Sequence, residues 1–416
     1  MALRKAGSNW VDGDRFFDRE IELAALRERV QDGTHTLLTA QRRMGKTSLV
    51  RELLRRLAKE GASETVFVDL EAASGPEDAV AEIAVQSRSV RRAWQTIKSG
   101  FANTLQGVIQ HIDEVGVSEA KVKFRAGVNR GNWQQKGDLV LKALTASRKP
   151  VVLAIDELPI LVSRLLKGAD NTITPERTQT TEELLSWLRK NGQAHRGQIC
   201  LILSGSVGLQ PVLQQVGMTA QANIYTPFDL RPWSQQTATD CLAELARTYG
   251  LDLSVEVRAA MCRRLRSLVP HHVQQFFDHL HEYLRRRDRL QASLEDVALV
   301  YEQELLGVRG QTDLDHYESR LKVVLDLESY RAALELLTEA ALTGCLVHEA
   351  LARYSDLYRA VSVRDVLHVL EHDGYLEKSS DGYRFVSALL EDWWHARHSQ
   401  HFLPIAARAP AEQTTQ

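Results

Sequence analysis

Gly45, Lys46 and Thr47 follow one another in the stretch "LLTAQRRMGKTSLV", which begins at residue 37. They form the second half of the pattern G-x-x-x-x-G-K-[ST], in which backbone N–H groups and the lysine hold phosphates while the hydroxyl contacts Mg²⁺. Ala40 stands where the pattern has its first glycine, and alanine fits there if the local φ is negative. A chance Gly-Lys-Thr before a helix is the alternative. We expect a bound nucleotide to contact Ala40, Gln41, Arg42, Arg43, Met44, Gly45, Lys46, Thr47 and Ser48.

Two acids, Asp156 and Glu157, end the apolar run "VVLAIDE". The first carboxylate of such a pair supports the Mg²⁺ shell, and the second can orient or deprotonate an attacking water. A turn that ends a strand is the alternative. Because the loop and the acid pair occur in order on strand–helix units, we predict a bound nucleotide with Mg²⁺, and Thr47 and Asp156 as the metal ligands. Glu157 and Lys46 are the expected catalytic residues.

A third candidate element is the end of the next apolar run, "LILSGS". Ser204 or Ser206 would emerge beside the terminal phosphate, where a hydroxyl can position water or sense the loss of phosphate. A turn made of small residues explains the same letters.

Aromatic residues precede the loop in "FFDREIEL". Phe16 or Phe17 is placed to cover an adenine, with Arg19 and Glu20 fixing the turn, so Arg19 is a candidate nucleotide contact. A solvated helix start capped by Asp18 is the alternative.

Short apolar runs alternate with helical patterns in the first half of the chain. The runs are "THTLLTA", "ETVFVDLEA", "KPVVLAIDELPIL" and "GQICLILSGSV". Near-continuous apolar runs are typical of parallel strands covered on both faces, and their alternation with helices predicts a doubly wound sheet. We therefore predict an α/β fold with a P-loop NTPase core over residues 1–233, interrupted by a mainly helical insert at about 76–148.

The second half of the chain has a different pattern. Residues 234–315 read as helices and predict a separate α-helical domain. Residues 316–402 read as three helices followed by two short alternating runs in "YLEKSSDGYRFVS", the plan of a winged helix-turn-helix. Residues 403–416, "LPIAARAPAEQTTQ", resemble a disordered tail. Trp393 and Trp394 are expected mainly to pack within the winged helix rather than on the ATPase core.

Composition places the 416-residue chain among ordinary globular proteins. It has 52 Lys and Arg against 54 Asp and Glu, so the net charge is −2 and gives no general attraction to nucleic acid. The four cysteines form no CxxC or Cys/His cluster, which favours reduced thiols. No apolar stretch is long enough for a signal peptide or a membrane span, so we expect a cytoplasmic protein without membrane partners.

Five stretches together carry a family resemblance. They are "FFDREIELAALRERV", "QRRMGKTSLVRELL", "VVLAIDELPILVSRLL", "LILSGSVGLQPVL" and "GYRFVSALLEDWW". With these stretches in this order, the chain resembles the archaeal-type ATPases. That family belongs to the AAA+/STAND side of the P-loop NTPases and is distantly similar to origin-recognition initiators. The similarity covers most of residues 16–397. In that family the loop commonly reads G-x-R-R-x-G-K-T-S, so Arg42 and Arg43 belong to the family's form of the loop.

The resemblance implies ATP with Mg²⁺, a helical lid and a winged helix. It also implies nucleotide-site roles for Lys46, Thr47, Asp156, Glu157 and Ser206. One departure concerns the arginine finger, because many relatives have a Gly-Arg pair shortly before the strand that here reads "NIYTPFDLRPWS". This chain has "MTAQAN" there, and Arg231 is the nearest substitute.

Two functions follow from these patterns. The first is an ATP-driven switch that moves lid and winged helix and is read by a partner protein or by self-assembly. The second is a DNA-binding ATPase of replication-initiator or transposition-helper type. Residues 320–397 hold 9 Lys and Arg against 13 Asp and Glu, which disfavours DNA at the winged helix.

Basic runs and tryptophans elsewhere in the sequence leave a partner surface open. Cations concentrate at residues 88–98, 263–266 and 285–289, and these runs suit DNA, an acidic partner or solvated helix faces. Trp94 and Trp133 would be partner contacts if they are exposed.

Overall fold

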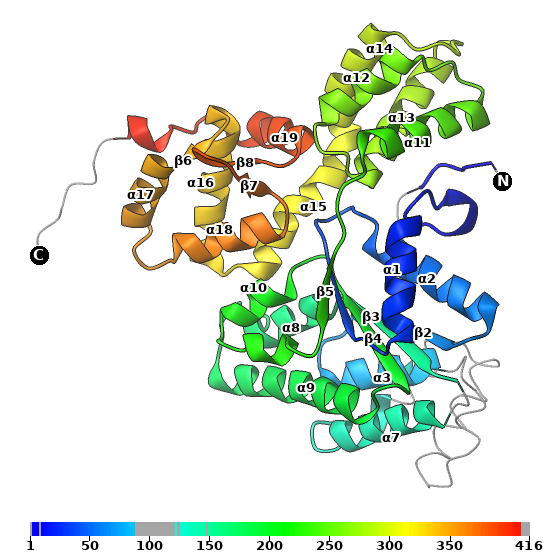
Figure 1. Ribbon diagram of the computed structural model, residues 1–416. Helices are drawn as coiled ribbons and strands as arrows, with labels where there is room; N and C mark the ends of the chain where they lie inside the picture. Colours follow the sequence, from blue (N-terminus) through cyan, green and yellow to red (C-terminus); the bar gives the residue numbers. More distant parts are fainter. Residues whose placement is uncertain (1, 8–9, 88–120, 123–124, 147–148, 409–416) are drawn as a thin grey trace, which may run out of the picture. The chain divides into compact units, whose positions relative to one another are not determined.

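The computed structural model describes residues 2–7, 10–87, 121–122, 125–146 and 149–408. The chain forms two compact units. Residues 19–39 and 46–230 make the first, which we call the sheet unit. Residues 1–18, 40–45 and 231–416 make the second, which we call the helical unit. Figure 1 follows the chain through both units by colour.

A five-stranded parallel sheet organises the sheet unit, with strand order β2-β3-β4-β1-β5. The strands are β1 (Thr36–Thr39), β2 (Glu64–Asp69), β3 (Val151–Asp156), β4 (Ile199–Ser204) and β5 (Thr226–Asp229). Every residue of β3 and β4 is buried, as their apolar sequences predict. The four predicted apolar runs contain β1 to β4. The predicted α/β fold with a parallel sheet is therefore confirmed.

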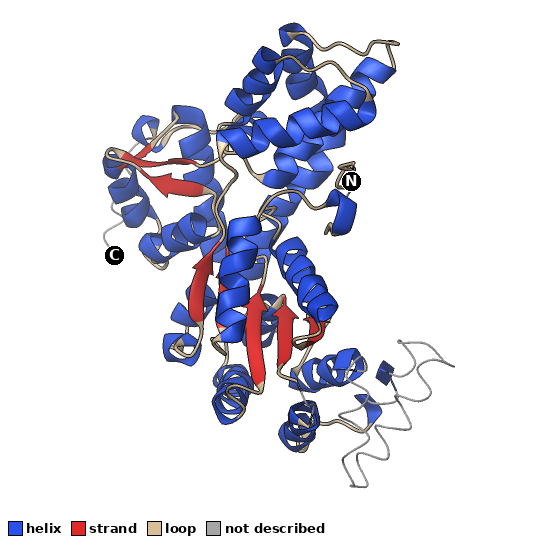
Figure 2. Ribbon diagram, turned by 45° about the vertical axis from the view of Figure 1, so that its right-hand side comes forward, coloured by secondary structure: helices blue, strands red, loops and turns tan. Residues whose placement is uncertain are grey.

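Helices connect the strands and cover the sheet (Figure 2). In the sheet unit they are α1 (Glu20–Gln31), α2 (Lys46–Glu60), α3 (Pro76–Gln86), α7 (Trp133–Thr145), α8 (Leu158–Lys167), α9 (Pro175–Ala194) and α10 (Leu209–Gln214), with a 3-10 turn η3 (Thr219–Ala222). α2 and α3 pack against β2, while α8 and α9 pack against β4. The described part of the predicted insert contains the helices α3 and α7, with turns and irregular backbone at residues 127–132.

Trp133 is only 4% exposed, and its ring meets Trp187 edge-on at 5.7 Å between centroids. The condition set for Trp133 as a partner contact, exposure of its side chain, is therefore not met, because this indole packs between α7 and α9. Trp94 and the basic run at 88–98 lie outside the described residues.

The helical unit begins with a 3-10 turn, η1 (Gly13–Arg15), and continues after β5 with helices. These are α11 (Gln235–Tyr249), α12 (Val255–Leu265), α13 (Pro270–Arg285), α14 (Leu294–Val300), the π turn η4 (Tyr301–Leu305) and α15 (Val308–Val324). The predicted boundary between lid and winged helix, at 315/316, falls inside α15. Residues 231–416 belong to a single compact unit, and the division into lid and winged helix stays a prediction.

Residues 327–408, which we call the C-terminal module, combine helices with a small antiparallel sheet. The elements are α16 (Leu327–Thr343), β6 (Leu346–Val347), α17 (His348–Leu357), α18 (Val363–His372), β7 (Leu376–Lys378), β8 (Gly382–Phe385), α19 (Ala388–His398) and the 3-10 turn η5 (Ile405–Ala407). The strand order is β6-β8-β7. The predicted pair of short runs corresponds to β7 and β8, while β6 adds a two-residue strand that the sequence pattern did not reveal.

Trp393 and Trp394 on α19 are buried in the C-terminal module. The Trp394 indole Nε1 donates a hydrogen bond to Thr338 Oγ1 at 3.2 Å, and its ring lies against Phe385. Packing within the module, the favoured expectation for these tryptophans, is therefore confirmed.

The chain remains ordered beyond residue 403, where the sequence suggests a tail. Ile405 is buried, and its backbone N–H donates to Glu339 Oε2 at 2.9 Å. The expectation of a disordered tail is therefore wrong for residues 403–408, and residues 409–416 lie outside the described residues.

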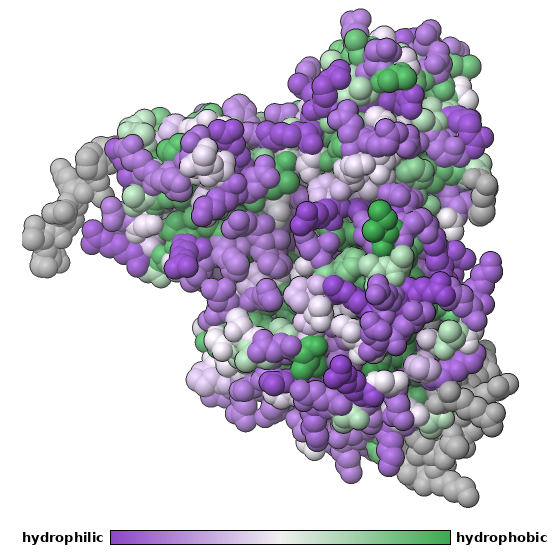
Figure 3. Space-filling model, viewed as in Figure 1, coloured by the Kyte–Doolittle hydropathy of each residue, from purple (hydrophilic) through white to green (hydrophobic). Residues whose placement is uncertain are grey.

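All four cysteines are free, in agreement with the expected reduced thiols. Among the described residues we find no helix with the length and apolar character needed to cross a membrane. On the face seen in Figure 3, hydrophobic residues are scattered among hydrophilic ones.

Candidate nucleotide site

The chemistry-bearing residues of the sheet unit gather where β3 and β4 end and α2 begins. In a parallel sheet the carboxyl ends of all strands lie at one edge, where ligands of open α/β folds bind. Asp156 is the last residue of β3 and Ser204 the last of β4. Lys46 and Thr47 open the 15-residue helix α2, whose N-terminal N–H groups favour an anion.

Thr47 and Asp156 meet directly. The Thr47 hydroxyl Oγ1 donates to Asp156 Oδ2 at 2.5 Å, and the Ser204 hydroxyl donates to Asp156 Oδ1 at 2.7 Å. Asp156 is 4% exposed, so these hydroxyls hold a carboxylate that is shielded from bulk water. The structure therefore joins the two predicted metal ligands, and a hydroxyl beside a carboxylate is a donor set that suits Mg²⁺.

Glu157 has a different partner from its neighbour Asp156. Its Oε2 accepts hydrogen bonds from both the backbone N–H and the hydroxyl of Ser206, each at 2.9 Å. The backbone of Glu157 is left-handed, with φ of 58°, at the position just before α8. An unusual backbone conformation at a polar site is a mark of functional constraint. Of the two serines weighed from sequence, Ser206 contacts Glu157 and Ser204 contacts Asp156.

Gly205 allows this close approach of β4 to α8. A Cβ on Gly205 would lie 2.6 Å from Pro159 Cδ and 3.5 Å from Glu157 Oε2. No local pattern of residues indicates this requirement, because it depends on the start of α8 lying against the end of β4.

The backbone conformation of the loop explains why Ala40 can replace the first glycine of the phosphate-loop pattern. Ala40 is not among the residues with positive φ, as its fit to the pattern requires, whereas Arg43 and Gly45 have φ of 67° and 88°. The left-handed conformation is thus adopted by an arginine and a glycine in the middle of the loop. Met44 is buried beside them, and Lys46 is only 7% exposed.

Loop residues 40–45 are part of the helical unit. The Gln41 side chain Nε2 donates to the backbone carbonyl of Gly374 at 2.7 Å, between α18 and β7 of the C-terminal module. Gly374 has φ of 77°, and a Cβ there would lie 2.4 Å from Gln41 Cγ. The side chain of Gln41 therefore sits against a glycine 333 residues away in the chain.

Arg19, a predicted nucleotide contact, is buried in the sheet unit. It has φ of 69°, and its Nη1 donates to Glu22 Oε1 at 2.6 Å. Arg19 occupies the N-cap position of α1 without a side-chain cap, so Asp18 does not cap this helix. In the helical unit, Phe17 meets Trp233 edge-on at 5.8 Å between ring centroids. Contact of Arg19 with a nucleotide, and of Phe16 or Phe17 with adenine, stays a prediction.

Asp69 is a site residue that sequence reasoning missed. It ends β2 directly opposite Asp156 in the strand register, so a third carboxylate reaches the same edge of the sheet. Partial burial raises the pKa of Asp69, and the negative charge of Asp156 raises it further. The available signal was the acid at the end of "VFVD", which repeats the pattern of an apolar strand followed by a carboxylate.

A family model for an ATPase domain found predominantly in Archaea matches residues 16–245, more than half of the chain. The chain belongs to this ATPase family. The matched region of this archaeal-type ATPase contains Lys46, Thr47, Asp156, Glu157 and Ser206. A comparison with curated proteins gives no match.

Two solved structures support the fold of this ATPase. The Walker-type ATPase of Pyrococcus abyssi is similar with a TM-score of 0.57 at 15% identity, covering 93% of this chain and 98% of that one. The ORC2 protein of Aeropyrum pernix, in ADPNP–ADP complexes, is similar with a TM-score of 0.54 at 13% identity, covering 93% of this chain and 98% of that one. Family and fold thus identify a P-loop ATPase with a helical C-terminal region.

Proposed function

We propose that this protein is a Mg²⁺-dependent ATPase that acts as a molecular switch. The observation that carries the proposal is the pairing of Thr47 with Asp156 at 2.5 Å, beside a Glu157 carboxylate held by Ser206. These residues supply a metal-binding pair and a candidate base at one edge of a parallel sheet. Bound Mg²⁺ would neutralise phosphate charge during phosphoryl transfer.

The protein side chains have separate roles in this scheme. Lys46 and the N–H groups at the start of α2 bind the outer phosphates. Glu157 orients the attacking water and takes its proton, while the two hydrogen bonds from Ser206 fix the direction of its carboxylate. A misdirected carboxylate loses catalysis steeply, since small displacements of reacting groups cost large factors in rate.

The switch role is supported by the contact between loop and C-terminal module. Gln41 belongs to the phosphate loop and bonds to Gly374 at 2.7 Å within the helical unit. A loop that rearranges around a nucleotide changes this hydrogen bond, and a change in the bond alters how the module is held. In this proposal the module is the winged helix of a STAND-like switch, and its position is read by a partner protein or by a second copy of the chain.

Phosphate release by the full chain tests the hydrolysis step. Glu157→Gln is expected to keep ATP binding and to lower the turnover rate by about 100-fold or more, because it removes the base but keeps the shape. Lys46→Ala is expected to abolish binding, and Lys59→Ala, an exposed lysine on the same helix, serves as the control. A Glu157→Gln variant that hydrolyses ATP like the parent contradicts the assignment of the base.

Hydrogen exchange tests the switch. The Glu157→Gln variant is compared with ATP and with ADP, following the amides of residues 40–45 and 370–378. Different protection in both segments is expected if the loop and the module respond together to the nucleotide. Equal protection in the two nucleotide states rejects a switch that works through this contact.

The DNA-binding alternative has less support from the described arginines. Among the described residues, ion pairs of the basic runs in the helical unit include Arg264–Glu302, Arg266–Glu391, Arg286–Glu282, Arg286–Glu304 and Arg289–Asp296. Arginines whose charge is already neutralised by a paired carboxylate attract DNA phosphates less strongly. ATP turnover measured with and without duplex DNA, at two salt concentrations, separates the functions, since salt-sensitive stimulation favours the DNA reading.

A further inference from the structure

We propose that the neighbouring starts of α12 and α14 form a docking surface for a partner protein, which binds through a segment with apolar side chains beside lysines or arginines. We call residues 252–256 and 290–295 the paired helix starts. All of them lie in the helical unit and none belongs to the nucleotide site. The proposal therefore goes beyond the ATPase function and does not depend on it.

Two segments of the helical unit enter helices side by side and in the same register. Asp252 forms a parallel bridge with Gln291, and its N–H donates to the Leu290 carbonyl at 2.8 Å. Two residues after the bridge, each segment reaches a serine that caps its helix, Ser254 for α12 and Ser293 for α14. The two helices also pack against each other (Figure 1). Residues at equal distances past the bridge therefore hold corresponding positions.

The first residue of each helix is a large apolar side chain in solvent. Val255 is 67% exposed and Leu294 is 56% exposed, while Leu290, in the same segment as Leu294, is 66% exposed. The local hydrophobic staple of a helix start uses the residue before the cap and not the one after it. Those positions are Leu253 and Ala292, and both are buried. The helix starts do not need the exposed side chains, and clustered exposed apolar residues mark a contact site.

Carboxylates accompany these apolar side chains. Asp252, Glu256 and Glu295 are exposed, and none of the three makes an ion pair within the part of the chain that the structure describes. The helix dipole favours an acid in each first turn but leaves its charge open to solvent. Arg289 is attracted by Glu295, but its guanidinium donates to Asp296 at 2.9 and 2.7 Å, which neutralises it. The surface is therefore apolar and negative.

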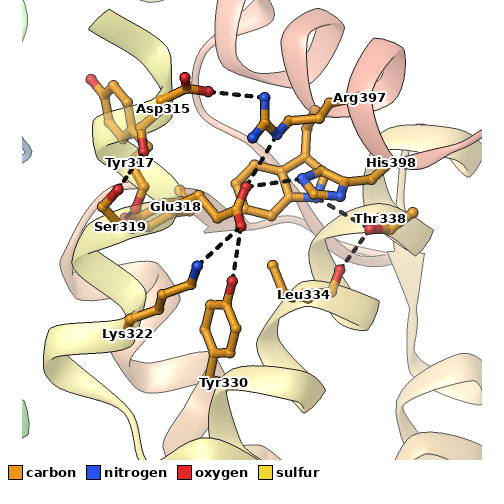
Figure 4. Close-up of polar contacts among 12 residues, drawn as sticks. Asp315, Tyr317, Glu318, Ser319, Lys322, Tyr330, Leu334, Thr338, Arg397 and His398 are labelled. Atoms are coloured by element: carbon orange, nitrogen blue, oxygen red, sulfur yellow. Dashed lines mark hydrogen bonds and ion pairs between the residues drawn. The ribbon is translucent and has the colours of Figure 1, made fainter. Parts of the chain in front are cut away.

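Acids elsewhere in the helical unit hold elements together. Figure 4 shows Glu318 of α15 between Tyr330 of α16 and Arg397 of α19. The Tyr330 hydroxyl donates to Glu318 Oε1 at 2.9 Å, and Arg397 Nε lies 3.3 Å from Glu318 Oε2. The carboxylates of the paired helix starts link no two elements of the described chain in this way. They remain open to an outside partner.

Charge and polarity together select the occupant. Apolar side chains of the partner cover the exposed valine and leucines, while its lysines or arginines pair with the carboxylates. DNA and anionic membranes are repelled by the same acids. A second copy that used this surface on both sides would bring like charges face to face. A cationic segment with apolar anchors, on another protein, is therefore the occupant.

Binding of designed peptides to the full chain tests the chemistry of the surface. Two helical peptides share one leucine stripe, and one carries lysines where the other carries glutamates. Fluorescence anisotropy at low and high salt measures the affinity of each. We expect the lysine peptide to bind more tightly, and Val255→Ser with Leu294→Ser to weaken it by about 10- to 100-fold, because the apolar anchors are lost. Glu256→Gln with Glu295→Gln should remove the salt-dependent part of the affinity.

The matched control is Leu327→Ser. Leu327 also opens a helix, α16, and is 58% exposed, but the following Glu328 is paired with Arg331 at 2.7 Å. This variant should change the affinity of neither peptide. If the serine double variant lowers the melting temperature, Val255→Thr with Leu294→Gln, which nearly keeps the side-chain sizes, decides by the same criteria. ATP turnover should be unchanged in all these variants.

Photo-crosslinking in the host identifies the natural occupant. A photoreactive amino acid replaces Leu294, or Leu327 as the control, in the full chain, and mass spectrometry identifies the crosslinked peptides. Peptides of another protein with lysine or arginine beside apolar residues, found at position 294 only, support the proposal. Crosslinks to a second copy or to segments without basic residues overturn it, as do crosslinks no stronger than those of the control. Equal binding of the two designed peptides, or a lysine-peptide affinity that neither double variant lowers, also overturns it.

Discussion

Replacing Gly205 by alanine tests the link between the end of β4 and the orientation of Glu157. The added Cβ would lie 2.6 Å from Pro159 Cδ and 2.8 Å from Pro159 Cγ. Carbon atoms in ordinary contact are about 3.5–4.0 Å apart. Because the proline ring is rigid and begins α8, the backbone must move by roughly 1 Å to relieve the clash. The φ of Gly205 is not positive, so the strain is steric and not conformational.

The size of the effect follows from this geometry. Overpacking costs about 1–3 kcal/mol, and the stiffer unfolded chain offsets about 0.4–1 kcal/mol of it. A net loss of about 1–2 kcal/mol lowers the melting temperature of a unit of this size by about 2–8 °C. The same movement displaces Ser206, which holds Glu157 through two hydrogen bonds of 2.9 Å. We expect the turnover rate to fall by about 10- to 100-fold.

Thermal unfolding and phosphate release at saturating ATP measure the two effects. Gly131→Ala is the control, because its Cβ would meet Asn129 Oδ1 at an ordinary 3.5 Å and should change neither quantity. A Gly205→Ala protein with the parent's melting temperature refutes the steric argument. A lower melting temperature with unchanged turnover refutes the positioning role of Ser206.

Three further predictions concern stability. His35 Nδ1 accepts a hydrogen bond from the Leu201 N–H at 3.1 Å, so its Nε2 donates to the Gly192 carbonyl. Burial lowers the pKa of His35 in the folded protein. As the pH drops below about 6.5, the unfolded chain therefore binds the proton first, and the free energy of unfolding falls. Between pH 7.5 and pH 5.5, the melting temperature should drop less for His35→Gln than for the parent. An equal drop contradicts this prediction. Arg43→Gly should not lower the melting temperature, because the left-handed conformation costs an arginine about 1–2 kcal/mol. A marked fall in the melting temperature would show that the Arg43 side chain stabilises the loop by more than this conformational cost. Trp394→Ala should destabilise the helical unit by about 3–5 kcal/mol in denaturant unfolding, and a loss below about 1 kcal/mol would contradict its role in the core.

Much of the sheet unit was predictable because its signals are local. β3 and β4 are buried on both faces, so their sequences are continuously apolar and end where the polar site begins. The search for continuous apolar runs did not identify β5, because most residues of this edge strand are exposed. Only the family resemblance indicated a strand there.

The amino-acid sequence by itself determined the chemistry of the nucleotide site. Gly45-Lys46-Thr47 and Asp156-Glu157 each form a short local pattern, and the geometry of parallel strands requires such patterns to meet at one edge of the sheet. The left-handed arginine in the loop and the role of Gly205 are absent from those patterns. They arise from the paths of neighbouring segments.

Only the tertiary structure decided which surfaces hold the site residues. Gln41 and Gly374 are 333 residues apart, and no periodicity of either segment encodes their hydrogen bond. The same holds for Trp133, whose burial depends on α9, and for Arg42, whose pKa is lowered by burial in the folded chain. Local patterns specify which groups are present, whereas burial and charge pairing are properties of packed segments and appear only when the chain is folded.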